Sequence, residues 1–182
     1  NNNPHGDTRM TSKLKTDVLE TVSGSGTIAL TNQLSGMTSA SVPSGSVVQV
    51  IYGSTSTYVN SSTTTFADTG LTASITPSST SSKVLVIIHQ NGMRKAVGNA
   101  GNRIMLSLFK GSSEHTMIGA GIAYNNANDY NGDNTSITVL DSPSSTSAIT
   151  YKTMFKNETA ASNVQVQHSS ATSTITLIEI KG

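Results

Sequence analysis

Apolar side chains occur along the chain in short segments, and polar turns separate one segment from the next. Within residues 103–111, for example, Ile104, Leu106 and Leu108 fall on alternate positions, which is the period of a β-strand. Comparable segments lie at 47–53, 63–77, 83–90, 115–124, 135–143, 148–157, 163–168 and 173–181. About nine or ten short strands with frequent turn signals predict an all-β sandwich, jelly roll or barrel.

Two of these segments carry more specific expectations. Residues 63–77 predict two extended pieces around a turn at Asp68-Thr69-Gly70. The run from Val84 to Ile88 is apolar at every position, so we expect both faces of that strand to be buried. One face would meet the core, and the other would be covered by the edge of the second sheet, a loop or another subunit.

The first 45 residues differ from the rest of the chain. Leu14, Val18, Leu19 and Val22 have helical spacing, but the segment is short, and we favour short extended segments there. Residues 35–45 are small and turn-forming, as in a linker. The sequence therefore predicts an N-terminal arm or shaft segment over 1–44 and a β-domain over 45–182.

Composition narrows the function classes. Only 12% of the 182 residues are charged and the net charge is +1, whereas about 25% is typical of soluble domains. Few clustered lysines and arginines argue against a nucleic-acid partner. The absence of cysteine excludes disulfides and thiolate metal sites. No apolar run is long enough for membrane insertion as a helix, which takes about 18 residues or more.

Nothing in the sequence indicates catalysis. No two of the histidines have a local metal-binding spacing; they are His5, His89, His115 and His168. There is no G-x-S-x-G nucleophile motif, and no pair of carboxylates is placed together by spacing. We expect no enzymatic activity, no catalytic residue, no metal site and no cofactor.

The stretch 124–134, YNNANDYNGDN, is the most unusual segment. Its alternating acidic and amide side chains resemble a calcium loop, but Asn134 and Leu140 stand where such a loop needs glycine and glutamate. It is otherwise a long polar β-hairpin tip or a recognition loop, because tyrosines among adaptable amides are typical of binding surfaces. The candidate recognition residues are Tyr124, Asn125, Asn126, Asp129, Tyr130 and Asp133. A second glycine-rich loop is expected at 92–102.

Several stretches together resemble a known protein family. They are GSVVQVIYGSTST (45–57), FADTGLTASITPSSTSSKVLVII (66–88), GNRIMLSLFKGS (101–112), LDSPSSTSAITYKTMFKN (140–157) and STITLIEIKG (173–182). In this order and spacing they are similar to the C-terminal β-domain of fibre-like virion proteins of tailed phages, of the type common in marine and cyanobacterial phages. The preceding SGSGTIALTNQLSGM (23–37) resembles the shaft or connector segments that lead into such domains.

The resemblance implies a jelly-roll-like antiparallel sandwich, often trimeric, exposed on the surface of the virion. It implies a structural protein, a tail-fibre-like knob that is able to contact a host surface receptor or glycan, and attachment to other virion proteins through the N-terminal segment. Two alternatives stay open, namely a decoration or neck protein of the phage head and a carbohydrate-binding module.

Overall fold

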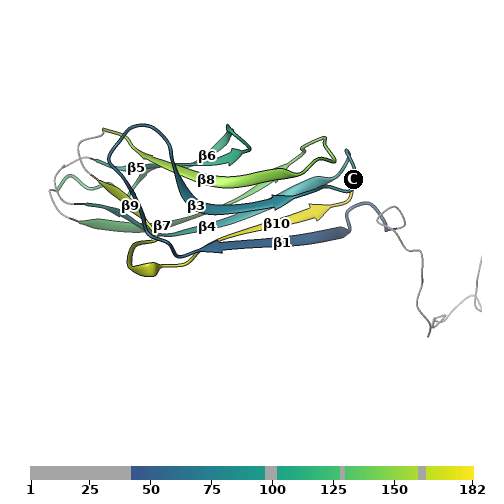
Figure 1. Ribbon diagram of the computed structural model, residues 1–182, viewed down its shortest axis with the longest axis horizontal. Helices are drawn as coiled ribbons and strands as arrows, with labels where there is room; N and C mark the ends of the chain where they lie inside the picture. Colours follow the sequence, from purple (N-terminus) through teal and green to yellow (C-terminus); the bar gives the residue numbers. More distant parts are fainter. Residues whose placement is uncertain (1–41, 97–101, 128–129, 160–162) are drawn as a thin grey trace, which may run out of the picture. The chain divides into compact units, whose positions relative to one another are not determined.

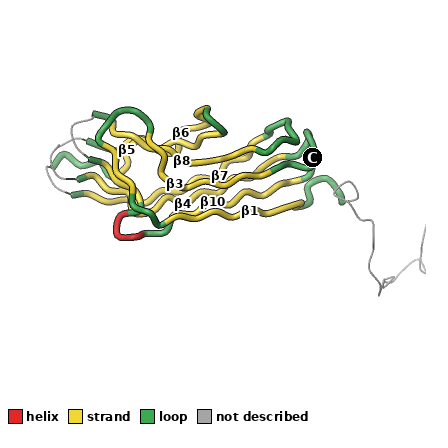
Figure 2. Tube along the Cα trace, in the orientation of Figure 1, coloured by secondary structure: helices red, strands yellow, loops and turns green. Residues whose placement is uncertain are grey.

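The computed structural model describes residues 42–96, 102–127, 130–159 and 163–182. These residues belong to one compact unit, Thr38–Gly182. Residues 1–41, to which most of the expectations for the N-terminal arm refer, lie outside the described residues. Asp129, a candidate recognition residue, also lies outside them. The described residues form two antiparallel β-sheets, and their helical structure is limited to one 3-10 turn, η2 (His168–Ser170) (Figures 1 and 2). No described helix is long and apolar enough to cross a membrane.

The strands divide between a larger sheet, here called sheet A, and a smaller one, sheet B. Sheet A contains β1 (Val47–Thr55), β10 (Ser173–Ile180), β4 (Lys83–Lys95), β7 (Asn131–Asp141), β9 (Val164–Val166) and β2 (Val59–Ser61). Sheet B contains β3 (Ala67–Ile75), β8 (Ile149–Asn157), β5 (Ile104–Lys110) and β6 (Ser113–Ile122).

The order of the strands is that of a jelly roll. Without the two three-residue strands β2 and β9, eight strands remain. Sheet A then runs β1-β10-β4-β7 and sheet B runs β3-β8-β5-β6, with every neighbour antiparallel. Counted along the chain, the first strand pairs with the eighth, the second with the seventh and the third with the sixth, as in two interlocked Greek keys. The predicted jelly-roll-like sandwich is confirmed.

Two expectations about local structure are wrong. Strand β4 does not stop near residue 90 but continues to Lys95, so the first four residues of the expected 92–102 loop belong to the strand, and residues 97–101 lie outside the described residues. A register shift between Gln90 and Met93, with Gly92 at φ +61°, lets the chain pass this point without leaving the sheet. Likewise Asp68-Thr69-Gly70 does not separate two strands, because β3 absorbs it as a bulge with Gly70 at φ +80°.

The segment 124–134 is not a hairpin tip. Strand β6 lies in sheet B and β7 lies in sheet A, so the chain crosses here from one sheet to the other. Strand β7 begins at Asn131, four residues earlier than the apolar pattern predicts. A polar strand end is hard to distinguish from a loop by hydrophobic alternation, which is the reason for the error.

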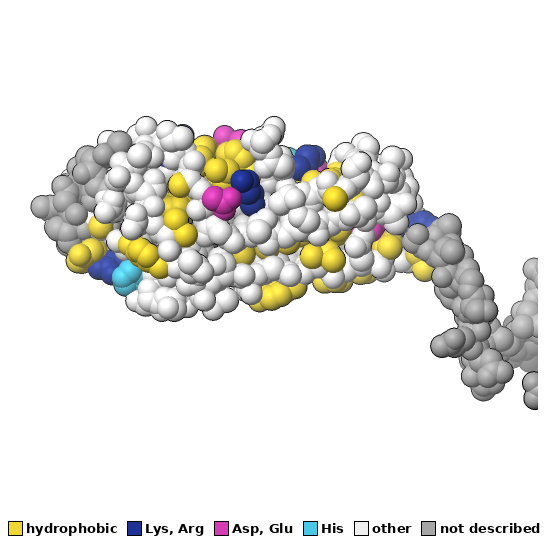
Figure 3. Space-filling model, viewed as in Figure 1, with side chains coloured by type: hydrophobic (Ala, Val, Ile, Leu, Met, Phe, Trp, Pro, Cys, Tyr) yellow, Lys and Arg dark blue, Asp and Glu magenta, His cyan; other side chains and the backbone are white. Residues whose placement is uncertain are grey.

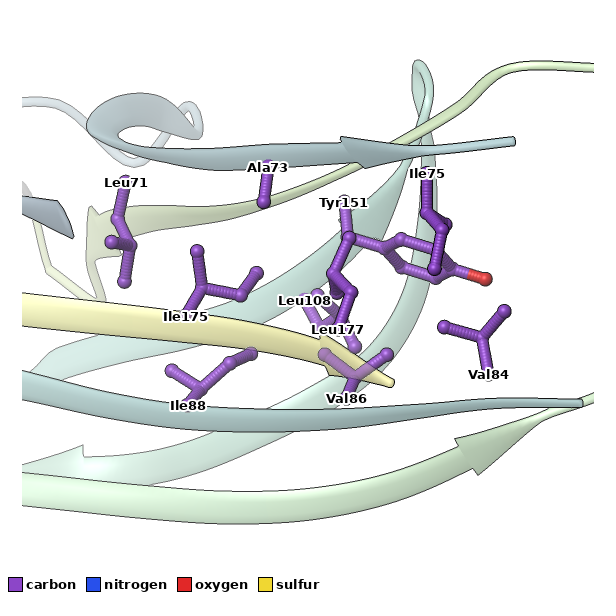
Figure 4. Close-up of a cluster of buried hydrophobic side chains, with 10 residues drawn as sticks. All are labelled: Leu71, Ala73, Ile75, Val84, Val86, Ile88, Leu108, Tyr151, Ile175 and Leu177. Carbon is purple, nitrogen blue, oxygen red and sulfur yellow. The ribbon is translucent and has the colours of Figure 1, made fainter. Parts of the chain in front are cut away.

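The core lies between the two sheets and is divided by a polar belt. Figure 4 shows the larger apolar cluster, in which Val86 and Leu177 of sheet A face Leu71 and Tyr151 of sheet B. A second cluster surrounds Phe155. Fully buried hydrogen-bonding side chains belong to the belt: Thr153 Oγ1 donates to Gln90 Oε1 at 2.8 Å, and Gln90 Nε2 donates to Ser173 Oγ at 3.1 Å. Because these groups satisfy one another, the belt can stay inside the sandwich.

Different segments of the chain lie at the two ends of the sandwich. At the end called proximal here, the chain enters and leaves side by side: Gly45 N donates to Lys181 O at 2.7 Å, and Lys181 N donates to Ser46 O at 2.9 Å. Strand β4 begins at this end and ends at Lys95. At about 3.3 Å per residue, the distal end therefore lies roughly 40 Å away. It contains the ends of β4 and β9 and the turn η2 (Figure 1).

Candidate recognition groove

An open groove lies at the distal end of sheet A. Its volume is about 460 Å³, and it lies over the end of β4, the start of β7 and the turn η2. The lining residues are Gly92, Met93, Arg94, Gly132, Asp133, Asn134 and His168. We call it the Arg94 groove. The register of the sheet creates it, because Met93 pairs with Asp133 and Arg94 pairs with Gly132.

Arg94 is the central side chain of the groove. Its guanidinium carbon lies 3.6 Å from the centre of the Tyr130 ring, which is the arrangement of a cation–π contact. Arg94 Nη1 also donates to His168 Nε2 at 2.5 Å. Among the described residues no carboxylate lies within ion-pair distance of Arg94. Within the described part of the chain, this half-buried cation thus contacts a ring and an imidazole.

His168 is held in one orientation from several sides. Because Nε2 accepts the hydrogen bond from Arg94, Nδ1 carries the proton and faces Ser169 Oγ at 2.9 Å. The ring of Tyr58 meets the imidazole edge-on, with 6.4 Å between the ring centres. Figure 3 shows a histidine beside basic side chains at this end of the molecule.

Gly92 permits the close approach that forms the groove. A Cβ atom at this position would lie 2.6 Å from the backbone nitrogen of His168 and 2.8 Å from the Cβ of Ala171. The Gly92 N–H donates to Asn134 Oδ1 at 2.8 Å. The absence of a side chain therefore lets η2 pack directly on β4. The hydrogen bond to the Asn134 side chain attaches β7 to the same point.

The neighbouring cation, Lys95, has a different role. Its side chain is fully buried, and its ammonium donates to the backbone and side-chain oxygens of Asn125 and to Ala127 O at 2.8 Å. These bonds attach the crossover between β6 and β7 to β4. Lys95 is a structural residue that positions the segment preceding Tyr130.

The predicted recognition residues separate into distinct places. Tyr130 and Asp133 meet at the groove, and both side chains are exposed. Asn125 instead accepts a hydrogen bond from Lys95. The centre of the Tyr124 ring lies 5.7 Å from the guanidinium carbon of Arg103. Asn126 is exposed and has no recorded contact with the groove. The structure thus brings together two of the predicted residues that it describes, and it leaves the other three outside the groove.

The sequence analysis missed four contributors to this site: Tyr58, Arg94, Asn134 and His168. Only Arg94 carried a signal, since Arg94-Lys95 is a rare pair of adjacent basic residues in this chain. His168 was unremarkable because its role depends on a turn that folds back onto Gly92, and that contact has no local sequence pattern.

The arrangement is suited to binding. The described residues hold no group of three or more histidine or acidic side chains that could ligate a metal ion. What the groove offers is a cationic fork, an exposed ring, an amide and a carboxylate on a polar surface. Groups of these kinds can recognise a polar ligand by hydrogen bonds and stacking. No family model matches the chain, and no curated protein matches it.

Proposed function

We propose that the chain is a structural protein of a phage virion, a homotrimeric, tail-fibre-like knob on the particle surface whose distal end contacts the host. The resemblance of residues 45–182 first suggested this function. The jelly-roll topology supports it by analogy, because viral capsid proteins and lectins use the same fold. The observation that carries the assembly part of the proposal is the outer face of sheet A.

That outer face is apolar across four strands. The register aligns one row that consists of Val50, Ile178, Leu85 and Leu140. The next row consists of Tyr52, Thr176, Ile87 and Thr138. Neither row contains a charged side chain. Tyr52 is 63% exposed and Leu140 is 52% exposed, and hydrophobic side chains follow β1 along the lower edge of Figure 3.

This face bears on the expectation that both faces of Val84–Ile88 are buried, the second one by the other sheet, a loop or another subunit. Val84, Val86 and Ile88 are buried in the core, whereas Leu85 and Ile87 point outwards and are only partly buried. No described part of the chain covers the outer face. Exposed contiguous apolar patches mark interaction surfaces, so we assign this one to contacts between subunits.

The outer face of sheet B differs in that it carries charged side chains as well as apolar ones. Lys152 pairs with Asp68 at 3.1 Å, and the ammonium of Lys156 lies 4.5 Å from the centre of the Phe66 ring. Phe66 in turn packs edge-on against Phe109. Charged groups and a covering ring suit this face to solvent. If subunits associate through one sheet, sheet A is the one that gains from burial.

The size of the apolar face sets a requirement for assembly. Four strands span about 15 Å, and the two rows with their flanking residues extend about 20 Å, which gives roughly 300 Å². Stable interfaces bury about 800 Å² on each partner. The face is therefore the centre of the proposed interface, and strand edges and further segments of the chain have to supply the remaining area.

The native mass of the purified chain, measured by size exclusion with light scattering, tests the proposal. We expect three times the chain mass of 18.9 kDa. Leu140→Lys should shift the mass to that of a monomer, because it places an ammonium in the apolar row. Met117→Lys is the matched control, since Met117 is 47% exposed on the outer face of sheet B and should leave the trimer intact. A monomeric wild-type chain, or equal effects of both variants, would contradict the assembly.

The Arg94 groove favours a second candidate function, a carbohydrate-binding module. The two functions differ in the assembly state of the protein. A module binds glycans as a free monomer, whereas a knob is a trimer incorporated in the virion. An antibody against the β-domain, applied to intact particles, should label the tail tips if the proposed function holds. Labelling of the head would instead support a decoration protein, and absence from particles would support the free module.

A further inference from the structure

Two arginines at the distal end form a natural comparison. Each lies near a tyrosine ring: Arg94 is 3.6 Å from the Tyr130 centre, and Arg103 is 5.7 Å from the Tyr124 centre. Arg103 forms an ion pair with Glu158, whose hydrogen bond raises the pKa of Arg103 further. Arg94 has no such partner among the described residues. Their surroundings resemble each other except for the carboxylate.

The lack of a described carboxylate at Arg94 indicates what the groove binds. A guanidinium has five N–H donors in a planar fork, and the contact with His168 uses Nη1 of Arg94. Among common anionic groups, carboxylates and phosphates fit such a fork best, because two of their oxygens can each accept one N–H. Stacking on Tyr130 fixes the plane of the fork before a ligand arrives, which reduces the entropy lost on binding.

The other groups of the groove select a sugar rather than a simple anion. Asn134 uses Oδ1 to accept the Gly92 N–H, and no described group accepts from its Nδ2. Asp133 uses Oδ1 to accept the Asn134 N–H, so its second oxygen is open to a donor. An amide donor beside a carboxylate acceptor fits hydroxyl groups, which both donate and accept.

The surface is long enough for more than one sugar unit. Asn134 lines the Arg94 groove and also a second open hollow of about 400 Å³. The second hollow is lined by His89, Asn91, Asn134, Thr135 and Ser136. Both hollows fall within the range of about 300–1,000 Å³ that small-molecule sites occupy. Their shared residue makes them one polar track along β4 and β7.

We propose that the Arg94 groove binds a saccharide that carries a carboxylate, such as a uronic acid chain. Arg94 takes the carboxylate, while Asn134 and Asp133 bind ring hydroxyls. The inference deepens the host-contact part of the proposed function by naming the ligand class. Arg94, Asn134 and Asp133 belong to one chain, so binding at the Arg94 groove needs no second subunit; the hollow lined by His89 and Ser136 adjoins the proposed subunit interface.

The test is an NMR titration of the labelled full chain with tri-galacturonate, maltotriose and inorganic phosphate, each up to about 10 mM. We expect tri-galacturonate to shift the amide signals of Gly92 and Asn134. Maltotriose and phosphate should bind at least about 10-fold more weakly, because each lacks half of the proposed contacts. Equal affinity for maltotriose would overturn the role of the carboxylate, and equal affinity for phosphate would leave only an anion site.

Variants locate the binding. Arg94→Gln should weaken tri-galacturonate binding about 10- to 100-fold, the loss expected for a hydrogen bond to a charged group. Arg103→Gln is the matched control and should stay within about twofold, because Arg103 already has Glu158. Arg94→Lys retains the charge but loses the fork, and wild-type affinity in this variant would contradict the proposed geometry. Circular dichroism confirms that each variant is folded.

The titration and the mass measurement fail independently. A monomeric chain that binds tri-galacturonate through Arg94 would remove the trimer and preserve this site. A trimer whose signals do not move with any of the three probes would overturn the ligand assignment and preserve the assembly.

Discussion

Ionic side chains occupy the two ends of the sandwich in different ways. At the proximal end, the buried carboxylates of Asp141 and Glu179 lie on either side of Val84. Each is surrounded by donors from neighbouring elements. At the distal end, Arg94 is half-buried, and its partners among the described residues are an imidazole and a ring but no carboxylate. The first arrangement is complete within the chain, and the second has capacity for a ligand.

The proximal carboxylates join elements that would otherwise separate. Asp141 of β7 accepts from Tyr151 Oη of β8 at 2.5 Å and from Lys110 Nζ of β5 at 3.0 Å, so it joins sheet A to sheet B. Glu179 accepts from the backbone and hydroxyl of Ser78, each at 2.7 Å, and from Gln49 Nε2 at 2.5 Å. Buried charges with this many partners hold a fold in one geometry.

The lesson is that burial alone does not identify a functional charge. Lys95 is more deeply buried than Arg94, yet carbonyl and amide oxygens of the chain take up its ammonium. The informative feature is an ionic group with unused hydrogen-bonding capacity in an open groove. By that criterion, Arg94 differs from Lys95, Asp141 and Glu179.

The largest effect should come from Gly92→Ala. A Cβ there collides with the backbone of His168, and the residue also has φ +61°, so we expect a loss of about 3 kcal/mol in the free energy of unfolding. Gly111→Ala is the matched control at the proximal end, because Gly111 has the same φ but nothing within 4 Å of its Cβ position. It should cost about 1 kcal/mol, the strain of the left-handed conformation alone.

Urea unfolding of both glycine variants measures this difference. Equal losses would show that the distal end does not depend on the close contact of η2 with β4. A Gly92→Ala chain that folds should also show altered amide signals at His168, since η2 has to move away from β4 to make room.

The next effect should come from Tyr151→Phe. It removes a donor from the buried Asp141 carboxylate and leaves that charge with Lys110 as its main partner. We expect a loss of about 2 kcal/mol at neutral pH, within the range for hydrogen bonds to charged groups. Tyr130→Phe at the distal end keeps the ring over Arg94 and should cost less than about 0.5 kcal/mol. Urea unfolding measures both losses in the free energy of unfolding. Similar losses would contradict the view that the proximal hydroxyl stabilises the fold and the distal one does not.

The fold was largely predictable from the sequence because apolar and polar residues alternate over parts of several strands. In β10, for example, Ile175 and Leu177 are fully buried while Thr174 and Thr176 are not, so the period of two is visible in the letters. Bulges were not predictable. Gly70 and Gly92 read as turn residues, yet each lies within a strand, because cross-strand pairing on both sides holds the chain in the sheet.

The candidate site was predictable only in part. Tyr130 and Asp133 were recognisable because a cluster of tyrosines and amides is unusual in any chain. Arg94 and His168 are 74 residues apart, and their contact depends on how β9 and η2 return to the end of β4. Contacts of that kind arise from topology, which a single sequence does not specify in detail.

The smallest expected effect is the dependence of stability on pH. It arises from Asp141 and Glu179 at the proximal end. Burial alone would raise the pKa of Glu179, but the hydrogen bonds from Gln49 and Ser78 outweigh it and lower the pKa. The pKa of Asp141 is lowered in the same way, against burial, by Tyr151 and Lys110. A carboxylate with a lowered folded pKa stabilises the fold fully above its unfolded pKa of about 4. That contribution is lost as the pH falls through the folded pKa.

We therefore expect the urea midpoint to be flat from neutral pH to about pH 5 and to decrease below about pH 4. Glu179→Gln should lower the midpoint at neutral pH, because an amide cannot accept from all the donors around it, and it should decrease less steeply in acid. Arg94→Gln should leave the acid profile unchanged, since no described carboxylate pairs with Arg94. If Glu179→Gln retained the full acid dependence, the two ends of the sandwich would not differ in the way that their hydrogen bonds indicate.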